Sequence, residues 1–583
     1  MIPSSVSEAY QEILSRVPPK QKSIVKKVLQ IIVGARRPLT IAEMAEALDL
    51  ALSPRSAAQA GTDPLQLERK LRHLCGLFVF IKNSKIYLIH QTAREFLIEK
   101  ANSNDVDFSY SSGLNDIEYQ MALICVQYLL SENLEGNTAE RPASQSFLEY
   151  SAIHWADHVR HMTFTSNQEM ADQLNRLYDT SGKRFTLWFP IFWKAVMPYQ
   201  RAPRMSALQL AAFNGHEQQV SSILDAGKES LNTPDDTETY PVIWASLNGH
   251  DKTVQMLLER GADVNAQGGD YGNALQAACV EGHDKIVQIL LERGADINAQ
   301  GGDYANNLQA ACVEGHDKIV QMLLERGADI NALAQGGGYA NALQATCVEG
   351  HDKIVQMLLE RGADINAQGG DYGNALQAAC VEGHDKIVQM LLERGADINA
   401  QGGDYGNALQ AACVDGHDKI TQILLERGAD INAQGGYYGN ALQAACVGGH
   451  KKIAQILLER GADINAQGGD YGNALQAACV GGHKKIAQIL LERGADINAQ
   501  GGYYGNALQA ACANGHDKIA QMLLERGAIN AQGGKYGNAL EAARQNRHYH
   551  IVQILQRYHC ADQSTYQFPL PKRRKVSSGF HVV

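Results

Sequence analysis

The sequence predicts a mainly α-helical chain: a solenoid of about eleven helix pairs, preceded by a small α+β module and a helical connector. A block of about 33 residues recurs almost unchanged over more than half of the 583 residues, and Gly-His dipeptides mark its period from His216 to His516. Each block holds two short apolar stretches with helical spacing, and neither can bury its apolar side alone. Successive blocks are therefore expected to stack.

One block, residues 272–302, shows how its elements are expected to form. Asn273 is a good helix N-cap and Gln276 stands three places on, so the pair is close to a capping box, in which each side chain satisfies a free backbone N–H. Gly282 ends this first helix, and a second helix is expected from Asp284 to about Arg293. The apolar stripe of the second helix consists of Ile286, Val287, Leu290 and Leu291. A turn-rich connector completes the block.

The recurring Gly-His, Ile-Val-x-x-Leu-Leu and Gly-Ala-Asp-Ile-Asn-Ala segments resemble the ankyrin repeat, and the resemblance covers residues 201–562. The usual Thr-Pro-Leu-His opening is replaced by Asn-Ala-Leu-Gln, as at Asn374 to Gln377, which we interpret as the same capping role performed by amides. The resemblance implies an α-solenoid that binds another protein through a concave surface formed by loop tips and first helices. It implies no catalytic residue and no cofactor.

The expected loop tips carry a tyrosine in block after block, often preceded by an aspartate. The candidate partner-binding residues are Tyr271, Tyr304, Tyr339, Tyr372, Tyr405, Tyr438, Tyr471, Tyr504, Asp303, Asp371 and Asp404. Tyrosine is a favoured contact residue because it is large, rigid and amphipathic. The alternative is that these tyrosines pack between neighbouring loops and hold the turns.

The balance of charge changes along the blocks. Residues 371–403 carry five acidic and two basic side chains, a net charge of −3, whereas residues 470–502 carry three of each. The acidic middle would favour a basic partner segment. The alternative is an ordinary solvated face.

Eight cysteines recur in step with the block, namely Cys279, Cys312, Cys347, Cys380, Cys413, Cys446, Cys479 and Cys512. Equivalent positions in stacked blocks lie roughly 10 Å apart, too far for a disulfide, so we expect free thiols in a reducing compartment. No cysteine or histidine cluster has metal-ligand spacing, and the Gly-His histidines are expected to make structural turn contacts. We therefore expect no metal, no cofactor and no enzymatic activity.

Residues 1–105 do not repeat and are expected to form helices followed by a hairpin at Asn83-Ser84, an order typical of a winged helix. Arg37-Pro-Leu-Thr40, and above all the segment Leu88-Ile-His-Gln-Thr-Ala-Arg-Glu-Phe-Leu97, resemble the winged-helix module of fungal NACHT-type signalling NTPases of the STAND class. In that family the histidine matching His90 touches a bound nucleoside diphosphate. Residues 106–200 resemble the helical connector that follows, and their aromatic side chains are expected to form its core.

A nucleotide-binding domain is not expected in this sequence. A P-loop needs Gly-x4-Gly-Lys-Ser/Thr, and the Gly-Lys pairs that end at Lys183, Lys228 and Lys535 all lack that form. His90 is therefore interpreted as structural, unless another chain supplies an NTPase in trans.

Residues 563–583 are expected to be a disordered basic tail, in which Lys572, Arg573, Arg574 and Lys575 are similar to a nuclear localisation signal. Either a nuclear import receptor binds this run, or the tail is merely solvated.

The sequence thus predicts a non-enzymatic interaction scaffold or sensor, the partner-recognition part of a fungal NACHT-type signalling or incompatibility receptor. Two alternatives are a trans-acting component of a STAND NTPase complex and a nuclear-imported ankyrin regulator. The net charge of −11 argues against a general nucleic-acid or anionic-membrane binder. The expected location is the cytoplasm, with the nucleus as the alternative.

Overall fold

The computed structural model describes residues 6–52, 63–75, 78–99, 113–134, 147–163, 168–227, 229–334 and 338–565. The chain divides into two compact units, Met1–Asp296 and Ile297–Val583. Among the described residues, the first unit holds the non-repeating region and three helix pairs of the repeat, and the second unit holds eight pairs. The mainly helical fold and the number of helix pairs predicted from the sequence are therefore confirmed.

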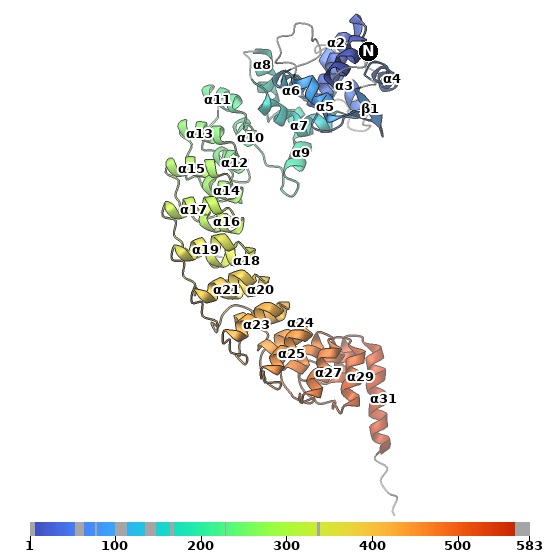
Figure 1. Ribbon diagram of the computed structural model, residues 1–583, viewed down its shortest axis with the longest axis vertical. Coiled ribbons are helices and arrows are strands. Elements are labelled where there is room, and N and C mark those ends of the chain that lie inside the picture. Colours follow the sequence, from blue (N-terminus) through green and yellow to red (C-terminus); the bar gives the residue numbers. More distant parts are fainter. Residues whose placement is uncertain are drawn as a thin grey trace, which may run out of the picture. The chain divides into compact units, whose positions relative to one another are not determined.

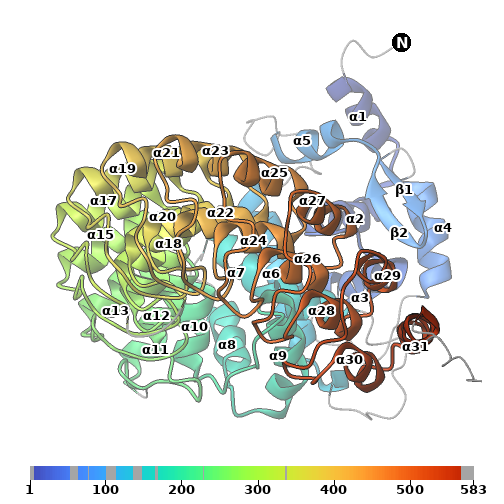
Figure 2. The ribbon, with the colours of Figure 1, turned by 90° about the horizontal axis from the view of Figure 1, so that it is seen from below.

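The winged-helix module consists of helices around a small antiparallel hairpin. Its elements are α1 (Val6–Ser15), α2 (Lys22–Gly34), α3 (Ile41–Leu52), α4 (Pro64–Leu74), β1 (Val79–Lys82), β2 (Lys85–Leu88) and α5 (Gln91–Glu99), with a 3-10 turn at Pro19–Gln21. The turn residues Asn83 and Ser84 have φ angles of 51° and 58°, which suit the twist of a two-residue hairpin. The predicted hairpin is present, and Figure 2 shows it beside α4.

The start of α3 joins the hairpin to the helices. A capping box is present there: Thr40 Oγ1 accepts from the Glu43 N–H at 3.1 Å, and Glu43 Oε2 accepts from the Thr40 N–H at 2.7 Å. The segment before α3 also lies along β2, because the Ile86 N–H donates to the Leu39 carbonyl at 2.8 Å. The helix cap and the sheet therefore share one backbone segment.

The connector contains α6 (Leu114–Leu129), α7 (Leu148–His161), α8 (Gln168–Leu177) and α9 (Lys183–Val196), with a 3-10 turn at Glu132–Leu134. Its predicted aromatic core is present. Trp155 and Trp188 are fully buried and cross edge to face, with ring centroids 5.5 Å apart. Fully burying such large side chains provides much of the hydrophobic stabilisation of this region.

A buried charged network joins α2 to the connector helices. The Arg36 guanidinium donates to both carboxylate oxygens of Glu118, at 2.8 and 3.0 Å, and also to Asp157. His158 has no exposed surface, and its Nδ1 lies 2.7 Å from the Glu118 carboxylate. Burial alone would raise the pKa of Glu118, but hydrogen bonds with His158 and Arg36 outweigh it, so this pKa is lowered.

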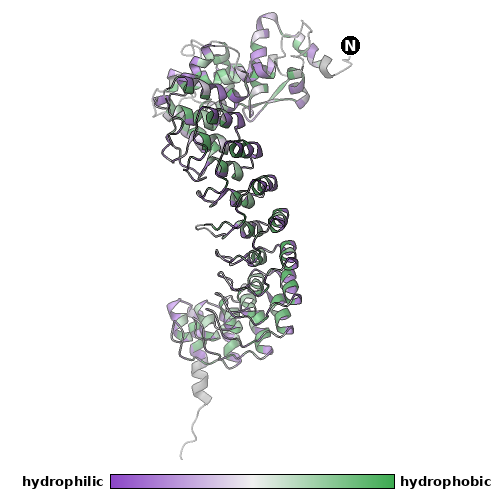
Figure 3. Ribbon diagram, turned by 90° about the vertical axis from the view of Figure 1, so that its left-hand side faces the viewer, coloured by the Kyte–Doolittle hydropathy of each residue, from purple (hydrophilic) through white to green (hydrophobic). Residues whose placement is uncertain are grey.

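The repeats are pairs of short helices. In the first unit they are α10 (Ala207–Asn214), α11 (Glu217–Asp225), α12 (Pro241–Leu247), α13 (Asp251–Glu259), α14 (Ala274–Val280) and α15 (Asp284–Glu292). In the second unit they are α16 (Asn307–Val313), α17 (Asp317–Glu325), α18 (Ala342–Glu349), α19 (Asp352–Glu360), α20 (Ala375–Glu382), α21 (Asp385–Glu393), α22 (Ala408–Asp415), α23 (Asp418–Glu426), α24 (Ala441–Gly448), α25 (Lys451–Glu459), α26 (Ala474–Val480), α27 (Lys484–Glu492), α28 (Ala507–Ala513), α29 (Asp517–Glu525), α30 (Ala539–Gln545) and α31 (Tyr549–Thr565). Within the second unit the pairs stack in chain order (Figure 1), and the loops project from one side of the stack (Figure 3).

From α14 to α30 each first helix begins at an asparagine cap, whereas Tyr240 precedes α12. Asn374 Oδ1 accepts from the Gln377 N–H at 2.9 Å, which confirms half of the predicted capping box. The other half is wrong for the internal repeats, because the fully buried Gln377 side chain reaches into the next repeat and donates to the Ala400 carbonyl at 3.1 Å. A buried amide needs a partner, and here the adjacent loop supplies it. The complete box occurs in the first repeat, at Ser206 and Gln209.

The recurring Gly-His pair has a structural explanation. His417 Nε2 donates to the Val381 carbonyl of the preceding repeat at 2.7 Å, which satisfies a carbonyl near the end of α20. Gly383 has a φ of 81°, and a Cβ there would lie 2.5 Å from the His417 ring. The glycine therefore turns the chain and leaves room for the histidine of the next repeat. The structural role predicted for these histidines agrees with this geometry.

The recurring Asp-Ile-Asn segment also links repeats. The Asp397 N–H donates to Asn366 Oδ1 of the preceding repeat at 2.8 Å, and Asp397 Oδ1 accepts from the Asn399 N–H at 3.0 Å. Where the sequence lacks this aspartate, the Ile529 N–H takes its place and donates to Asn498 Oδ1 at 2.9 Å. The backbone contact thus survives a change of loop length.

The cysteines of the repeats are buried free thiols, as predicted. Burial raises the pKa of Cys413 to about 12, so this thiol stays protonated at neutral pH. Arg544 stands where the internal repeats carry cysteine, is exposed, and donates to Glu541 at 2.8 Å. The charged side chain of the last repeat is therefore accommodated at the surface.

Candidate protein-binding surface

The loop tips of the second unit form one continuous row of side chains. We define the tip row as Gly338, Asp371, Asp404, Tyr437, Asp470, Tyr503 and Lys535. After Gly338, each tip N–H donates to the carbonyl of the preceding tip, at distances from 2.8 to 3.2 Å. Because this backbone ladder is unbroken over the row, the exposed side chains on it are held at fixed positions along the stack.

A second row runs beside the first. We define the tyrosine ladder as Tyr339, Tyr372, Tyr405, Tyr438, Tyr471, Tyr504 and Tyr536. Neighbouring rings from Tyr339 to Tyr471 are stacked with centroids 6.2 to 6.3 Å apart, and the last two rings are 6.4 Å apart. The tyrosines therefore pack between loops, yet each keeps part of its surface exposed. The two interpretations made from the sequence, loop packing and partner contact, are compatible, and partner contact stays a prediction.

Carboxylates flank the first part of the ladder. The Tyr304 hydroxyl donates to Glu314 at 2.8 Å, Tyr339 to Glu349 at 3.0 Å, and Tyr372 to Glu382 at 3.4 Å. Burial, followed by the hydrogen bond to Glu349, raises the pKa of Tyr339 to about 12, so the phenol remains a neutral donor. Ten residues after Tyr438, Tyr471 and Tyr504 the chain has Gly448, Gly481 and Asn514 instead. The surface thus changes from carboxylate-rich to uncharged at this position of the repeats.

The remaining aspartates and tyrosine predicted from the sequence lie on the same kind of loop. Asp303, Asp371 and Asp404 are exposed at loop tips of the second unit. Tyr271 lies on a loop of the first unit and is half-buried. The structure therefore places the predicted contact residues on loops, as the pattern indicated.

Tyr437 and Tyr503 are two functional candidates beyond those predicted from the sequence. They are the tips at which the Asp-Tyr pair becomes Tyr-Tyr, and their side chains are 50% and 46% exposed. The Tyr437 ring meets Tyr438 edge to face, with centroids 5.3 Å apart. An exposed aromatic side chain held by a second ring is a typical anchor for a partner.

His90 lies at the N-terminus of α5, where it is exposed. Its Nδ1 accepts from the Thr92 N–H at 3.2 Å and lies 3.0 Å from Thr92 Oγ1. That oxygen is also 3.0 Å from the Tyr10 hydroxyl of α1. The imidazole thus caps a helix within its own module, and a role toward a nucleotide in trans stays a prediction.

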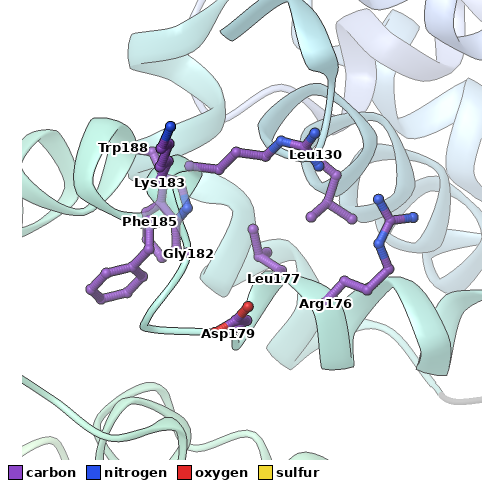
Figure 4. A pocket seen from close by; sticks show the side chains of 9 residues that line it. Leu130, Arg176, Leu177, Asp179, Gly182, Lys183, Phe185 and Trp188 are labelled. Atoms are coloured by element: carbon purple, nitrogen blue, oxygen red, sulfur yellow. The ribbon is translucent and has the colours of Figure 1, made fainter. Parts of the chain in front are cut away.

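A hollow of about 300 Å³ lies in the connector (Figure 4). Arg176, Lys183 and Arg184 give it positive charge, and its apolar wall includes Leu177 and Trp188. The Asp179 carboxylate also lines it, beside these three cations.

Two further observations concern the described part of the chain. No cluster of three or more His, Cys, Asp or Glu side chains there has the arrangement of a metal site. None of the helices there combines the length and apolarity needed to cross a bilayer. The predicted localisation signal, Lys572 to Lys575, lies outside the described residues.

The repeat region matches the family model described as ankyrin repeats (3 copies), in overlapping segments that together span residues 194–501, and a single ankyrin repeat model at residues 506–534. The chain is an ankyrin-repeat protein. Ankyrin repeats imply protein–protein interaction, so this array is a protein-binding scaffold, as predicted.

The N-terminal region matches the model described as the winged helix domain of GPI inositol-deacylase, over residues 14–111. The predicted winged helix is therefore confirmed.

The curated relatives are fungal. The chain is 22% identical over 222 residues to vegetative incompatibility protein HET-E-1 of Podospora anserina, an alignment that covers 34% of this chain and 16% of that protein. It is 30% identical over 294 residues to azaphilone pigments biosynthesis cluster protein L of Monascus ruber, covering 45% of this chain and 60% of that protein. The chain therefore spans less than two thirds of the length of both relatives.

Among solved structures, the human ASB11 ankyrin repeat domain aligns with 25% identity over 39% of this chain and 99% of that chain, with a TM-score of 0.35.

Proposed function

We propose that this protein is a non-enzymatic recognition component whose array binds another protein through the tip row and the tyrosine ladder. The observation that supports this proposal is the unbroken backbone ladder beneath exposed side chains at Asp371, Asp404 and Tyr437. A backbone that is already ordered loses little conformational entropy on binding, which favours affinity. Action in the cytoplasm is part of the proposal.

We further propose that the recognised partner belongs to a signalling or incompatibility system of the fungal NACHT type. The 22% identity to an incompatibility protein and the match to a winged-helix model support this role. The role is a proposal because the aligned region covers 16% of that relative.

Photo-crosslinking from two different faces of the array, the loop tips and the second helices, tests the binding surface. The photoreactive residue p-benzoylphenylalanine replaces Asp371 or Asp404 on the tip row, or the exposed Lys419 or Lys452 on the second helices, in the full chain. We expect the same partner to be crosslinked from both tips and from neither second-helix position. Equal crosslinking from the two faces, or no protein crosslinked from the tips, would contradict the proposal.

A separate assay tests the absence of enzymatic activity. The purified full chain is incubated with ATP and magnesium, and released phosphate is measured. We expect no turnover above the protein-free rate, and steady hydrolysis that copurifies with the chain would overturn the non-enzymatic proposal.

A further inference from the structure

One lysine of this protein shows how a cation binds to the tip row. Lys535 Nζ lies 4.8 Å from the ring centroid of Tyr503 and 5.5 Å from that of Tyr536, and it also donates to the Tyr503 hydroxyl. A cation within about 6 Å of an aromatic face is attracted by the ring quadrupole. Tyr503, Tyr504 and Tyr536 therefore form a cluster that is already occupied by a lysine from the next repeat.

The same tyrosine cluster occurs two repeats earlier without a lysine. Tyr437, Tyr438 and Tyr471 stand at the positions equivalent to Tyr503, Tyr504 and Tyr536. The Tyr437 ring meets Tyr438 and Tyr471 edge to face, with centroids 5.3 and 5.5 Å apart. The position equivalent to Lys535 is Asp470, so this cluster has a carboxylate where the other cluster has an ammonium group.

Acidic tips precede and follow Tyr437 along the tip row. Asp404 and Asp470 are the tips before and after Tyr437, and both are exposed. The backbone joins the three, because the Tyr437 N–H donates to the Asp404 carbonyl at 3.1 Å and the Asp470 N–H to the Tyr437 carbonyl at 3.2 Å. Two carboxylates beside aromatic faces complement an ammonium group better than either feature alone.

Two phenols of this cluster, Tyr438 and Tyr471, keep their neutral form. Burial raises the pKa of Tyr438, and burial followed by a hydrogen bond with Tyr437 raises that of Tyr471. Neutral rings retain the electron-rich faces that attract cations, and the hydroxyls remain available as acceptors.

We propose that the cluster of Tyr437, Tyr438 and Tyr471, together with Asp404 and Asp470, binds a lysine side chain of an extended segment of the protein partner. The lysine of the partner takes the place that Lys535 occupies in the cluster of Tyr503. This inference rests on the proposed function, since it names the partner chemistry recognised by the tip row.

Fluorescence anisotropy with the full chain tests the site. The probe is a short fluorescein-labelled peptide of alternating lysine and glycine, and the control peptide carries norleucine in place of lysine. At an ionic strength of about 0.15 M, where distant surface charges are screened, we expect the lysine peptide to bind and the norleucine peptide not to bind. Equal binding of the two peptides would overturn the inference.

Matched tyrosine variants locate the binding. Tyr437→Ala should weaken the affinity for the lysine peptide by about threefold to tenfold, which corresponds to the free energy of an exposed cation–π contact. The control Tyr549→Ala changes an exposed tyrosine that lies outside the tip row and the tyrosine ladder, and it should leave the affinity unchanged. Equal effects of the two substitutions would contradict the assignment.

Two reciprocal substitutions test whether a lysine at the tip blocks the neighbouring tyrosine cluster. Asp470→Lys places a lysine where Lys535 stands in the other cluster, so it should block peptide binding. The control Asp371→Lys makes the same change of charge at a tip whose preceding tip is Gly338, which has no ring. Lys535→Asp should strengthen binding, and Tyr503→Ala should then weaken it. Equal losses for Asp470→Lys and Asp371→Lys would show that charge alone is responsible and would overturn the inference.

Failure of this inference differs from failure of the proposed function. If the tips crosslink a partner but Tyr437→Ala and Asp470→Lys leave that crosslinking and the peptide affinity unchanged, the lysine site is wrong and the binding surface stands. If the lysine peptide binds but the tips crosslink no protein, the proposed function fails instead.

Discussion

The non-repeating region and the array of the second unit stabilise buried polar groups in different ways. Among the described residues before the repeats, the buried polar contacts follow no repeating pattern, as with Glu118, which joins Arg36 and His158. In the second unit the same contact recurs in nearly every repeat, as with the histidine that donates to the preceding carbonyl. One substitution should therefore affect the whole of the first region but only a local part of the array.

The largest expected effect comes from breaking the buried charged network. Glu118→Gln removes the buried carboxylate that pairs with both Arg36 and His158 and leaves Arg36 with Asp157, so we expect a loss of about 3 kcal/mol in the free energy of unfolding of the first unit. All four tryptophans, Trp155, Trp188, Trp193 and Trp244, belong to this unit, so tryptophan emission during urea unfolding measures it. The control is Glu149→Gln, at an exposed position of α7, which should change little. Equal effects of the two substitutions would contradict the network's importance.

A second effect is the acid sensitivity of the first unit. Burial lowers the pKa of His216 to about 3 and that of His250 to about 4, whereas unfolded histidine titrates near 6.5. The unfolded state therefore binds protons first as the pH falls below about 6.5. The stability contributed by the neutral imidazoles is complete above that pH and is lost toward pH 4, by about 2 to 3 kcal/mol for each histidine.

Urea unfolding followed by tryptophan emission at several pH values between about 7 and 4.5 checks this dependence. His250→Gln should reduce the slope of stability against pH. A slope that is the same with and without His250 would contradict the assignment.

A smaller and more local effect is expected inside the array. Gly383 and Gly395 both have positive φ angles, of 81° and 91°, but a Cβ would clash with His417 only at Gly383, since nothing lies within 4 Å at Gly395. Each Gly→Ala change should cost about 1 kcal/mol for its backbone conformation, and Gly383→Ala should cost about 1 to 2 kcal/mol more for the clash. Urea unfolding followed by circular dichroism at 222 nm compares the two. Equal costs would mean that the contact between the glycine and the histidine does not constrain the stack.

The smallest effect concerns one link between repeats. Asn432→Ala removes the acceptor of the Asp463 N–H, which lies 2.8 Å from Asn432 Oδ1, and should cost about 1 kcal/mol. Hydrogen exchange should speed up at Asp463 and its neighbours while the tips of distant repeats keep their rates. Faster exchange throughout the second unit would show that the repeats unfold together. It would contradict the expectation that a substitution in the array acts only locally.

Local signals account for what the sequence predicted well. The period, the asparagine caps and the Asn83-Ser84 turn each depend on residues a few positions apart, and all are present in the structure. The destination of the Gln377 side chain could not be predicted in the same way, because it depends on how far one repeat is rotated against the next. The tyrosine ladder and the Lys535 contact depend on the same geometry. The only signal in the sequence was the change from Asp-Tyr to Tyr-Tyr at Tyr437 and Tyr503.

Hydroxyl-radical footprinting tests the central claim, that the array binds its partner through the loop tips. The full chain is oxidised alone and in the complex captured by crosslinking, and modification of each side chain is compared by mass spectrometry. We expect the half-exposed Tyr437 to be protected in the complex, while leucines of the second helices, such as Leu425, keep their modification rates. Protection of the second helices with Tyr437 still fully reactive would contradict the account.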